Sequence, residues 1–135
     1  MNALEKLMQF DEGKLKLPTG EVKIRLKKLG GEEFVFSIQA LPPDVAGEIS
    51  QQMIDIRFAK NGSKSASFEI YRAQIRTIIE GCPTIFKNGD LQKKFGARTP
   101  AELVEKLMLS GEMDELSKAI EGLSGYEDES DNLKN

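Results

Sequence analysis

The sequence predicts an α+β domain that is mostly helical, with an N-terminal β-hairpin followed by four to five helices. Apolar and polar residues alternate on both sides of Gly30-Gly31, which is typical of half-buried strands. After Leu41, apolar residues recur in steps of three and four, which is typical of amphipathic helices. The 135 residues are the length of one ordinary domain, so we expect a single globular unit over residues 1–125.

The hairpin is expected at about residues 21–40. Its two apolar faces are formed by Val22, Ile24 and Leu26 on the first strand and by Phe34, Phe36 and Ile38 on the second. Gly30-Gly31 between them tolerates the positive φ angles of a tight turn. Because an isolated hairpin is marginal in water, helices must cover its apolar side. Before the hairpin, residues 2–10 predict a short helix, without a clear cap.

Two longer helices are expected to follow, within a helical part spanning about residues 42–124. The first begins after the prolines at 42–43 and ends at Asn61-Gly62; its apolar stripe is Val45, Ile49, Met53 and Ile56. The second is capped by Ser65 or Ser67 and ends at Gly81 and Pro83; its stripe is Phe68, Tyr71, Ile75, Ile78 and Ile79. A short helix is expected near Leu91–Phe95.

The C-terminal part predicts two capped helices and an acidic tail. Thr99, Pro100 and Glu102 form a capping box with proline at the first helical position. Ser110 is expected to cap the second helix, which Gly125 ends. Residues 110–135 carry two basic and eight acidic side chains, and residues 126–135 are too polar to bury a core, so we expect a flexible tail there.

The composition argues against catalysis and against metal or cofactor binding. The chain has no histidine, which is the commonest general base and metal ligand. Its single cysteine, Cys82, lies at a helix end, where the helix dipole raises the pKa of a thiol. The acidic run in the tail lacks the glycine and distal glutamate of a calcium loop. We therefore predict no catalytic, metal or cofactor-binding residues and expect a non-enzymatic protein.

Binding of nucleic acid or of a protein partner remains open. A modest basic face on the hairpin would be formed by Lys23, Arg25, Lys27 and Lys28, and Lys14 and Lys16 could add to it. Aromatic residues do not interleave with these basic residues, as a platform for stacking single-stranded bases would require.

No apolar run reaches the roughly 20 residues of a membrane helix, and no signal peptide is recognisable. We therefore expect a cytoplasmic location and no membrane partner.

The segment "FGARTPAELVEKLMLSGEMDELSKAIEGLSGY" resembles the C-terminal half of XkdN-like tail assembly chaperones of long-tailed phages and prophages of Gram-positive bacteria. The shared pattern is an aromatic-Gly-Ala step, Thr-Pro, a Leu-rich helix, Gly-Glu-Met, and a helix closing on Leu-Ser-Gly-Tyr. The lysine-rich strand, the strand at Phe36–Leu41 and the two helices that follow agree in order. The resemblance covers most of residues 20–126.

The resemblance implies a non-enzymatic chaperone in the host bacterial cytoplasm. It would bind the tape measure protein, assist assembly of the tail tube protein, and be absent from the mature virion; self-association is a further possibility. We expect helix-in-groove packing. The candidate contacts are the apolar side chains of the two C-terminal helices: Leu103, Leu107, Met108, Met113, Leu116 and Ile120. The alternatives are a nucleic-acid-binding or regulatory protein that uses the basic hairpin face, and a structural head–tail or tail component of the virion.

Overall fold

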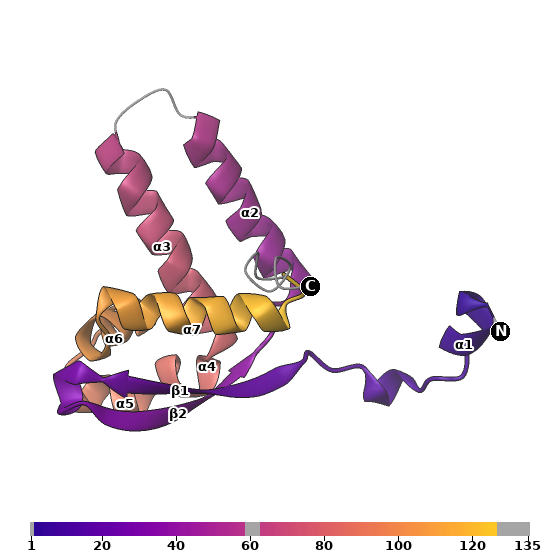
Figure 1. Ribbon diagram of the computed structural model, residues 1–135, viewed down its shortest axis with the longest axis horizontal. Helices are drawn as coiled ribbons and strands as arrows, with labels where there is room; N and C mark the ends of the chain where they lie inside the picture. The colour runs from indigo at the N-terminus through magenta and orange to yellow at the C-terminus, as the bar shows by residue number, and fades with distance from the viewer. Residues whose placement is uncertain (1, 59–62, 127–135) are drawn as a thin grey trace, which may run out of the picture.

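Strands β1 (Thr19–Leu26) and β2 (Glu32–Gln39) form the predicted antiparallel hairpin in a computed structural model that describes residues 2–58 and 63–126 (Figure 1). Val22 pairs with Phe36 and Ile24 with Phe34, so both predicted apolar rows lie on one face. The connection is longer than a two-residue turn: a 3-10 turn (η2, Lys27–Leu29) precedes Gly30 and Gly31, which have φ angles of 75° and 74°. The two glycines therefore have the positive φ angles that the sequence suggested.

Helices α3 (Ser63–Gly81) and α4 (Pro83–Phe86) cover part of the hairpin's apolar face. The ring of Phe86 stacks on Phe36 with centroids 6.3 Å apart. Helix α4 is a single turn that the sequence pattern did not predict, because Pro83 was interpreted as a stop; it occupies the first position of a new helix instead. The predicted short helix near Leu91 is α5 (Gly89–Lys94), and the side chain of Asn88 caps it.

Helices α6 (Pro100–Leu107) and α7 (Ser110–Leu123) complete the core. Thr99 caps α6 as predicted, since its Oγ1 accepts the N–H of Glu102 at 3.1 Å. The second bond of the predicted capping box differs: the Glu102 carboxylate accepts the N–H of Arg98, the residue before the cap. Ser110 is already helical rather than a cap. At this end of α7, the buried carboxylate of Glu112 accepts the N–H groups of Leu109 and Lys27, at 3.0 and 3.2 Å. Glu112 thus ties the start of α7 to the end of β1.

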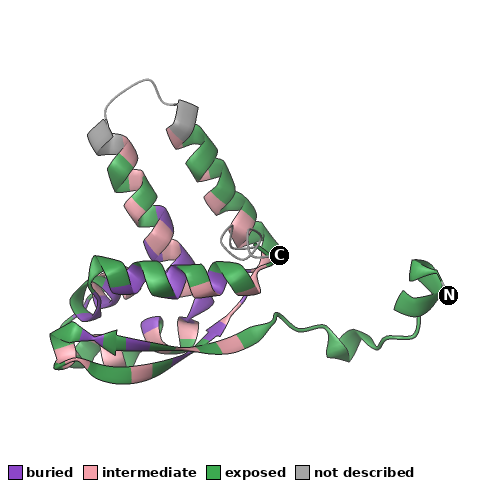
Figure 2. Ribbon diagram, viewed as in Figure 1, coloured by how far each residue is buried: buried purple, intermediate pink, exposed green. Residues whose placement is uncertain are grey.

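Two segments lie outside this core. Helix α2 (Pro43–Phe58) projects from the body beside the first half of α3, and no side chain of residues 43–56 is buried (Figures 1 and 2). The N-terminal segment holds α1 (Ala3–Leu7), capped by Asn2, and a 3-10 turn (η1, Glu12–Lys14). Every residue from Asn2 to Thr19 is exposed, and we call residues 2–17 the arm.

The α+β, mostly helical fold class is thereby confirmed. The helix at Ala3–Leu7 was expected within residues 2–10, and Asn2 supplies the cap that the sequence did not reveal. Helix α3 already begins at Ser63, so Ser65 and Ser67 lie inside it. The predicted turn at Asn61-Gly62 and most of the predicted acidic tail fall outside the described residues. Within residues 2–58 and 63–126, no helix is long and apolar enough to cross a membrane.

Candidate partner-binding surface

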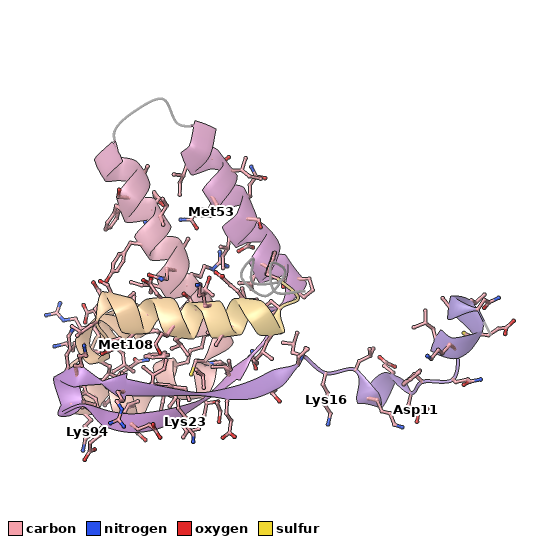
Figure 3. All side chains as sticks on the ribbon, in the orientation of Figure 1. Asp11, Lys16, Lys23, Met53, Lys94 and Met108 are labelled. Carbon is pink, nitrogen blue, oxygen red and sulfur yellow. The ribbon has the colours of Figure 1, made fainter. Side chains whose placement is uncertain are left out.

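The six side chains predicted to contact a partner lie in the protein's own core. Their exposed fractions are all between 0 and 5%. They belong to the cluster that α6 and α7 form with the hairpin, α3 and α4, and Figure 3 shows Met108 within the body: Leu103, Leu107, Met108, Met113, Leu116 and Ile120. In this conformation they are not available to a partner, and any contact through them would require α6 and α7 to leave the core.

Outside the arm, exposed apolar side chains occur mainly on α2 and the first half of α3. The exposed fraction is 38% for Met53, 46% for Ile54, 58% for Phe68 and 46% for Ile70. Along α3 burial increases toward the body, where Ile75 and Ile78 are buried, as Figure 2 shows by the change from green to purple. The predicted apolar stripes of both helices therefore exist, but their distal parts are only partly covered.

A groove of about 500 Å³ runs along α3, and we call it the α3 groove. Its apolar floor is formed by Phe68, Tyr71, Ile75 and Ile79, which follow each other at helical spacing. Gln52 of α2 and Ala101 of α6 lie on its two sides. The shape and lining suit an apolar helical segment laid against α3.

Polar contacts fix the walls of the α3 groove. The Tyr71 hydroxyl donates a hydrogen bond to Glu105 Oε2 at 2.8 Å, across from α3 to α6. Desolvation, and then the bond and charge of Glu105, raise the pKa of Tyr71 from 10.0 to about 12, so this phenol stays a neutral donor at physiological pH. The Arg72 guanidinium lies 5.9 Å from the centre of the Phe68 ring. These contacts hold both aromatic side chains in place at the groove.

Polar contacts also join α2 to α3. Arg76 forms an ion pair with Glu48, and Gln52 Nε2 donates to Glu69 Oε2 at 2.9 Å. Glu48 is exposed and Arg76 is partly exposed, and such pairs near the surface contribute about 1 kcal/mol or less. Since α2 buries no side chain over residues 43–56, little apolar burial adds to these contacts. Helix α2 is therefore the most weakly held of the longer helices in the described part of the chain.

A second cleft, of about 370 Å³, lies at the base of α2. We call it the α2 cleft. Its apolar lining comes from α2 and from the two segments that flank its base: Leu41, Ala46, Ile49, Met53, Ile54 and Tyr126. Both clefts thus open beside exposed apolar side chains of the projecting helical pair.

The exposed hairpin face is less basic than the sequence suggested. Arg25 lies opposite Glu33 in the strand register, Lys23 lies opposite Val35, and Glu21 lies on the same face. Lys28 turns away and donates to the Glu105 carbonyl at 2.6 Å. Lys14 and Lys16 belong to the arm, and Figure 3 shows Lys16 well away from Lys23. The basic residues therefore do not form one continuous patch.

Cys82 is a core residue rather than a reactive thiol. Its exposed fraction is 0%, and its Sγ donates to the Ser37 carbonyl of β2 at 3.3 Å. Desolvation by burial raises the pKa of this thiol to about 11, so it is protonated near neutral pH. Within the described residues, no group of three or more His, Cys, Asp or Glu side chains is placed to hold a metal ion.

A small α+β domain with two apolar clefts beside exposed apolar helices has the features of a protein that binds other proteins. Comparison with known families agrees. Residues 4–135 match the family model described as "Phage XkdN-like tail assembly chaperone protein, TAC". The match spans nearly the whole chain, so this protein belongs to the XkdN-like phage tail assembly chaperone family. Among curated proteins and among solved structures, none matches the chain.

Proposed function

We propose that this protein is a phage tail assembly chaperone that shields apolar helical segments of the tape measure protein and assists assembly of the tail tube. The observation that carries the proposal is an apolar groove along α3 in which Phe68 is exposed, in a member of this family. It would act in the host bacterial cytoplasm and be absent from the mature virion. Its contacts would be made at the α3 groove rather than by the six core residues of α6 and α7.

The mechanism would rest on reversible burial of apolar surface. An apolar helix laid along the groove would cover the exposed Phe68 and the half-buried Tyr71 and Ile79, and would itself be removed from water. Each apolar Å² removed from water contributes roughly 25 cal/mol before the costs of association are subtracted. Because only a few side chains are involved, binding stays weak enough for release when tail assembly supplies a better-packed surface.

The weakly held α2 would let the groove adapt to different segments. It is restrained by the half-buried Ala46 and Ile49, which pack against the core, and by the polar contacts of Glu48 and Gln52 with α3. A small rotation of α2 would widen the groove and leave the buried side chains of the core in place, because none of these belongs to residues 43–56. Such a groove suits a long partner with many similar apolar segments.

Co-expression of the tagged chaperone with the tape measure protein of the same phage tests the proposal. Phe68→Asp places a charge on the exposed part of the groove and should reduce recovery of the tape measure protein at least about tenfold. Ile70→Asp is the matched control, because Ile70 is an exposed apolar residue of the same helix that does not line the groove. Both variants should retain the circular dichroism spectrum and melting temperature of the wild type.

Two results would contradict the proposal. Equal recovery with Phe68→Asp and Ile70→Asp would show that the α3 groove is not the contact. Detection of the protein in purified phage particles at stoichiometric amounts would identify a structural virion component instead of an assembly chaperone.

A further inference from the structure

The arm is unusually apolar for a segment in which every residue is exposed. Six large apolar side chains occur within residues 2–17, with exposed fractions between 37% and 81%: Leu4, Leu7, Met8, Phe10, Leu15 and Leu17. Solvated arms are normally poor in such residues. The family match begins at residue 4, so the arm belongs to the family pattern and is not an addition to it. Its apolar side chains need a surface to cover them.

The direction in which the arm leaves the body points to a surface on another molecule. The Ala40 N–H donates to the Pro18 carbonyl at 2.8 Å, so strand pairing continues to the residue where the arm begins. Pro18 restricts Leu17 to extended backbone, and Leu15 is extended as well, with φ −73° and ψ 115°. The arm therefore continues the line of β1 away from its own helices, and Figure 3 shows Lys16 and Asp11 at increasing distance from the body.

The α2 cleft offers a matching surface. It is apolar, open, and contains Met53 and Ile54, which are only partly covered. The base of α2 and the C-terminal end of α7, which border this cleft, lie on the side of the body from which the arm leaves (Figure 1). Because the arm and the cleft lie on the same side of the molecule, a two-fold axis can place the arm of each copy opposite the cleft of the other.

We propose that two copies of this chain form an arm-exchanged dimer in which the arm of each copy packs in the α2 cleft of the other. Leu4, Leu7 and Met8 have the i, i+3, i+4 spacing with which a helical turn enters an apolar groove. Residues 2–17 and the nine residues that line the cleft would give each copy about 25 interface residues, as in a stable interface of about 20–30 residues a side. The proposal does not depend on the α3 groove and stands or falls separately from the proposed function.

Sedimentation of the full chain over a range of concentrations tests this dimer. The wild type should sediment as a dimer. Leu7→Asp combined with Phe10→Asp, and separately Ile54→Asp, should each raise the dissociation constant about thirtyfold or more. Leu109→Asp is the matched control, because Leu109 is an exposed apolar residue outside both arm and cleft; it should remain dimeric. The arm variant removes no contact within the body, so misfolding does not confound its result.

Mixing the two defective variants tests exchange itself. The arm variant retains an intact cleft and Ile54→Asp retains an intact arm, so the mixture should form a heterodimer through one intact arm–cleft pair while each variant alone stays monomeric. A wild type that is monomeric at every concentration would overturn the proposal and indicate that the arm folds back or serves another partner. A dimer that survives both sets of substitutions, or a mixture that forms no heterodimer, would overturn it as well.

Discussion

Gly81 and Gly122 both lie near the end of a helix, but only Gly81 faces another side chain. A Cβ atom built on Gly81 would lie 2.4 Å from Cγ2 of Ile120, which is fully buried on α7. A Cβ atom on Gly122 would meet nothing within 4 Å. The absence of a side chain at Gly81 therefore lets α3 and α7 approach each other closely.

We expect Gly81→Ala to lower the free energy of unfolding by about 1–3 kcal/mol, because Ile120 is confined by the core and must shift to accept a methyl group. Gly122→Ala is the control and should raise that free energy by up to about 1 kcal/mol, since alanine favours the helix and has room. Urea denaturation of both variants measures the difference. Equal stability of the two variants would show that α3 and α7 are not in close contact at this point.

The sequence identified Gly81 correctly as the end of a helix but not as a point of contact. Helix ends depend on neighbours in the chain, so a glycine followed by Pro83 is enough to predict one. The approach of Ile120, by contrast, depends on where α7 packs, some forty residues further along. The same reason explains the misplaced cap of α7: its start is held by Glu112, whose second hydrogen bond goes to the backbone of Lys27, far away in the sequence.

At the scale of elements, apolar periodicity predicted which residues form each stripe but not which stripe is covered. Alternation placed Ile24 and Phe36 on one face of the hairpin, and the structure confirms this. The stripes of α2 and α7 look alike in the sequence, yet Leu116 is fully buried whereas Met53 is 38% exposed. The difference comes from packing: α7 lies against the hairpin and α3, while α2 lies against α3 alone among the larger contacts of the described elements. The partner-binding residues could therefore not be chosen from periodicity.

Helix α2 should open more readily than the helices of the core. We expect the amides of α2 to exchange with solvent faster than those of Ile75–Ile79 in α3, because no side chain of residues 43–56 is buried whereas Ile75 and Ile78 are. Gly47→Ala should slow exchange in α2 by up to about fivefold, since a Cβ atom there meets nothing and alanine stabilises a helix by about 1 kcal/mol. Hydrogen exchange followed by mass spectrometry measures both effects.

Equal protection of the amides of α2 and of the buried half of α3 from hydrogen exchange would contradict this expectation. Gly122→Ala provides a control for general stabilisation, because it should slow exchange in α7 without a specific effect on α2. If Gly47→Ala both slows exchange in α2 and weakens recovery of the tape measure protein, the adaptability of α2 would be linked directly to partner binding.

At the scale of the whole molecule, a single apolar core joins the hairpin to helices α3, α4 and α7. Leu26 of the hairpin, Ile78 of α3, Phe86 of α4 and Leu116 of α7 are all almost completely buried and belong to the same apolar cluster. No residue of the arm belongs to this cluster. Residues 43–56 of α2 contribute no buried side chain to it. The buried core and most of the exposed apolar side chains thus belong to different parts of the chain: the core keeps the fold, and the arm, α2 and the first half of α3 carry most of the exposed apolar surface.

This division predicts how the protein responds to loss of its arm. Deletion of residues 2–17 should leave the free energy of unfolding within about 0.5 kcal/mol of the wild type when both are measured at concentrations low enough to be monomeric, because every residue of the arm is exposed. Leu116→Ala, in contrast, should cost about 2–5 kcal/mol, since it removes a fully buried side chain from the core. Denaturant titration followed by circular dichroism measures both.

A truncated protein that is substantially less stable under monomeric conditions would show that the arm packs on its own body. If stability is lost only at concentrations where the wild type is dimeric, the arm contributes by binding a second copy, because association adds to apparent stability in proportion to the logarithm of protein concentration.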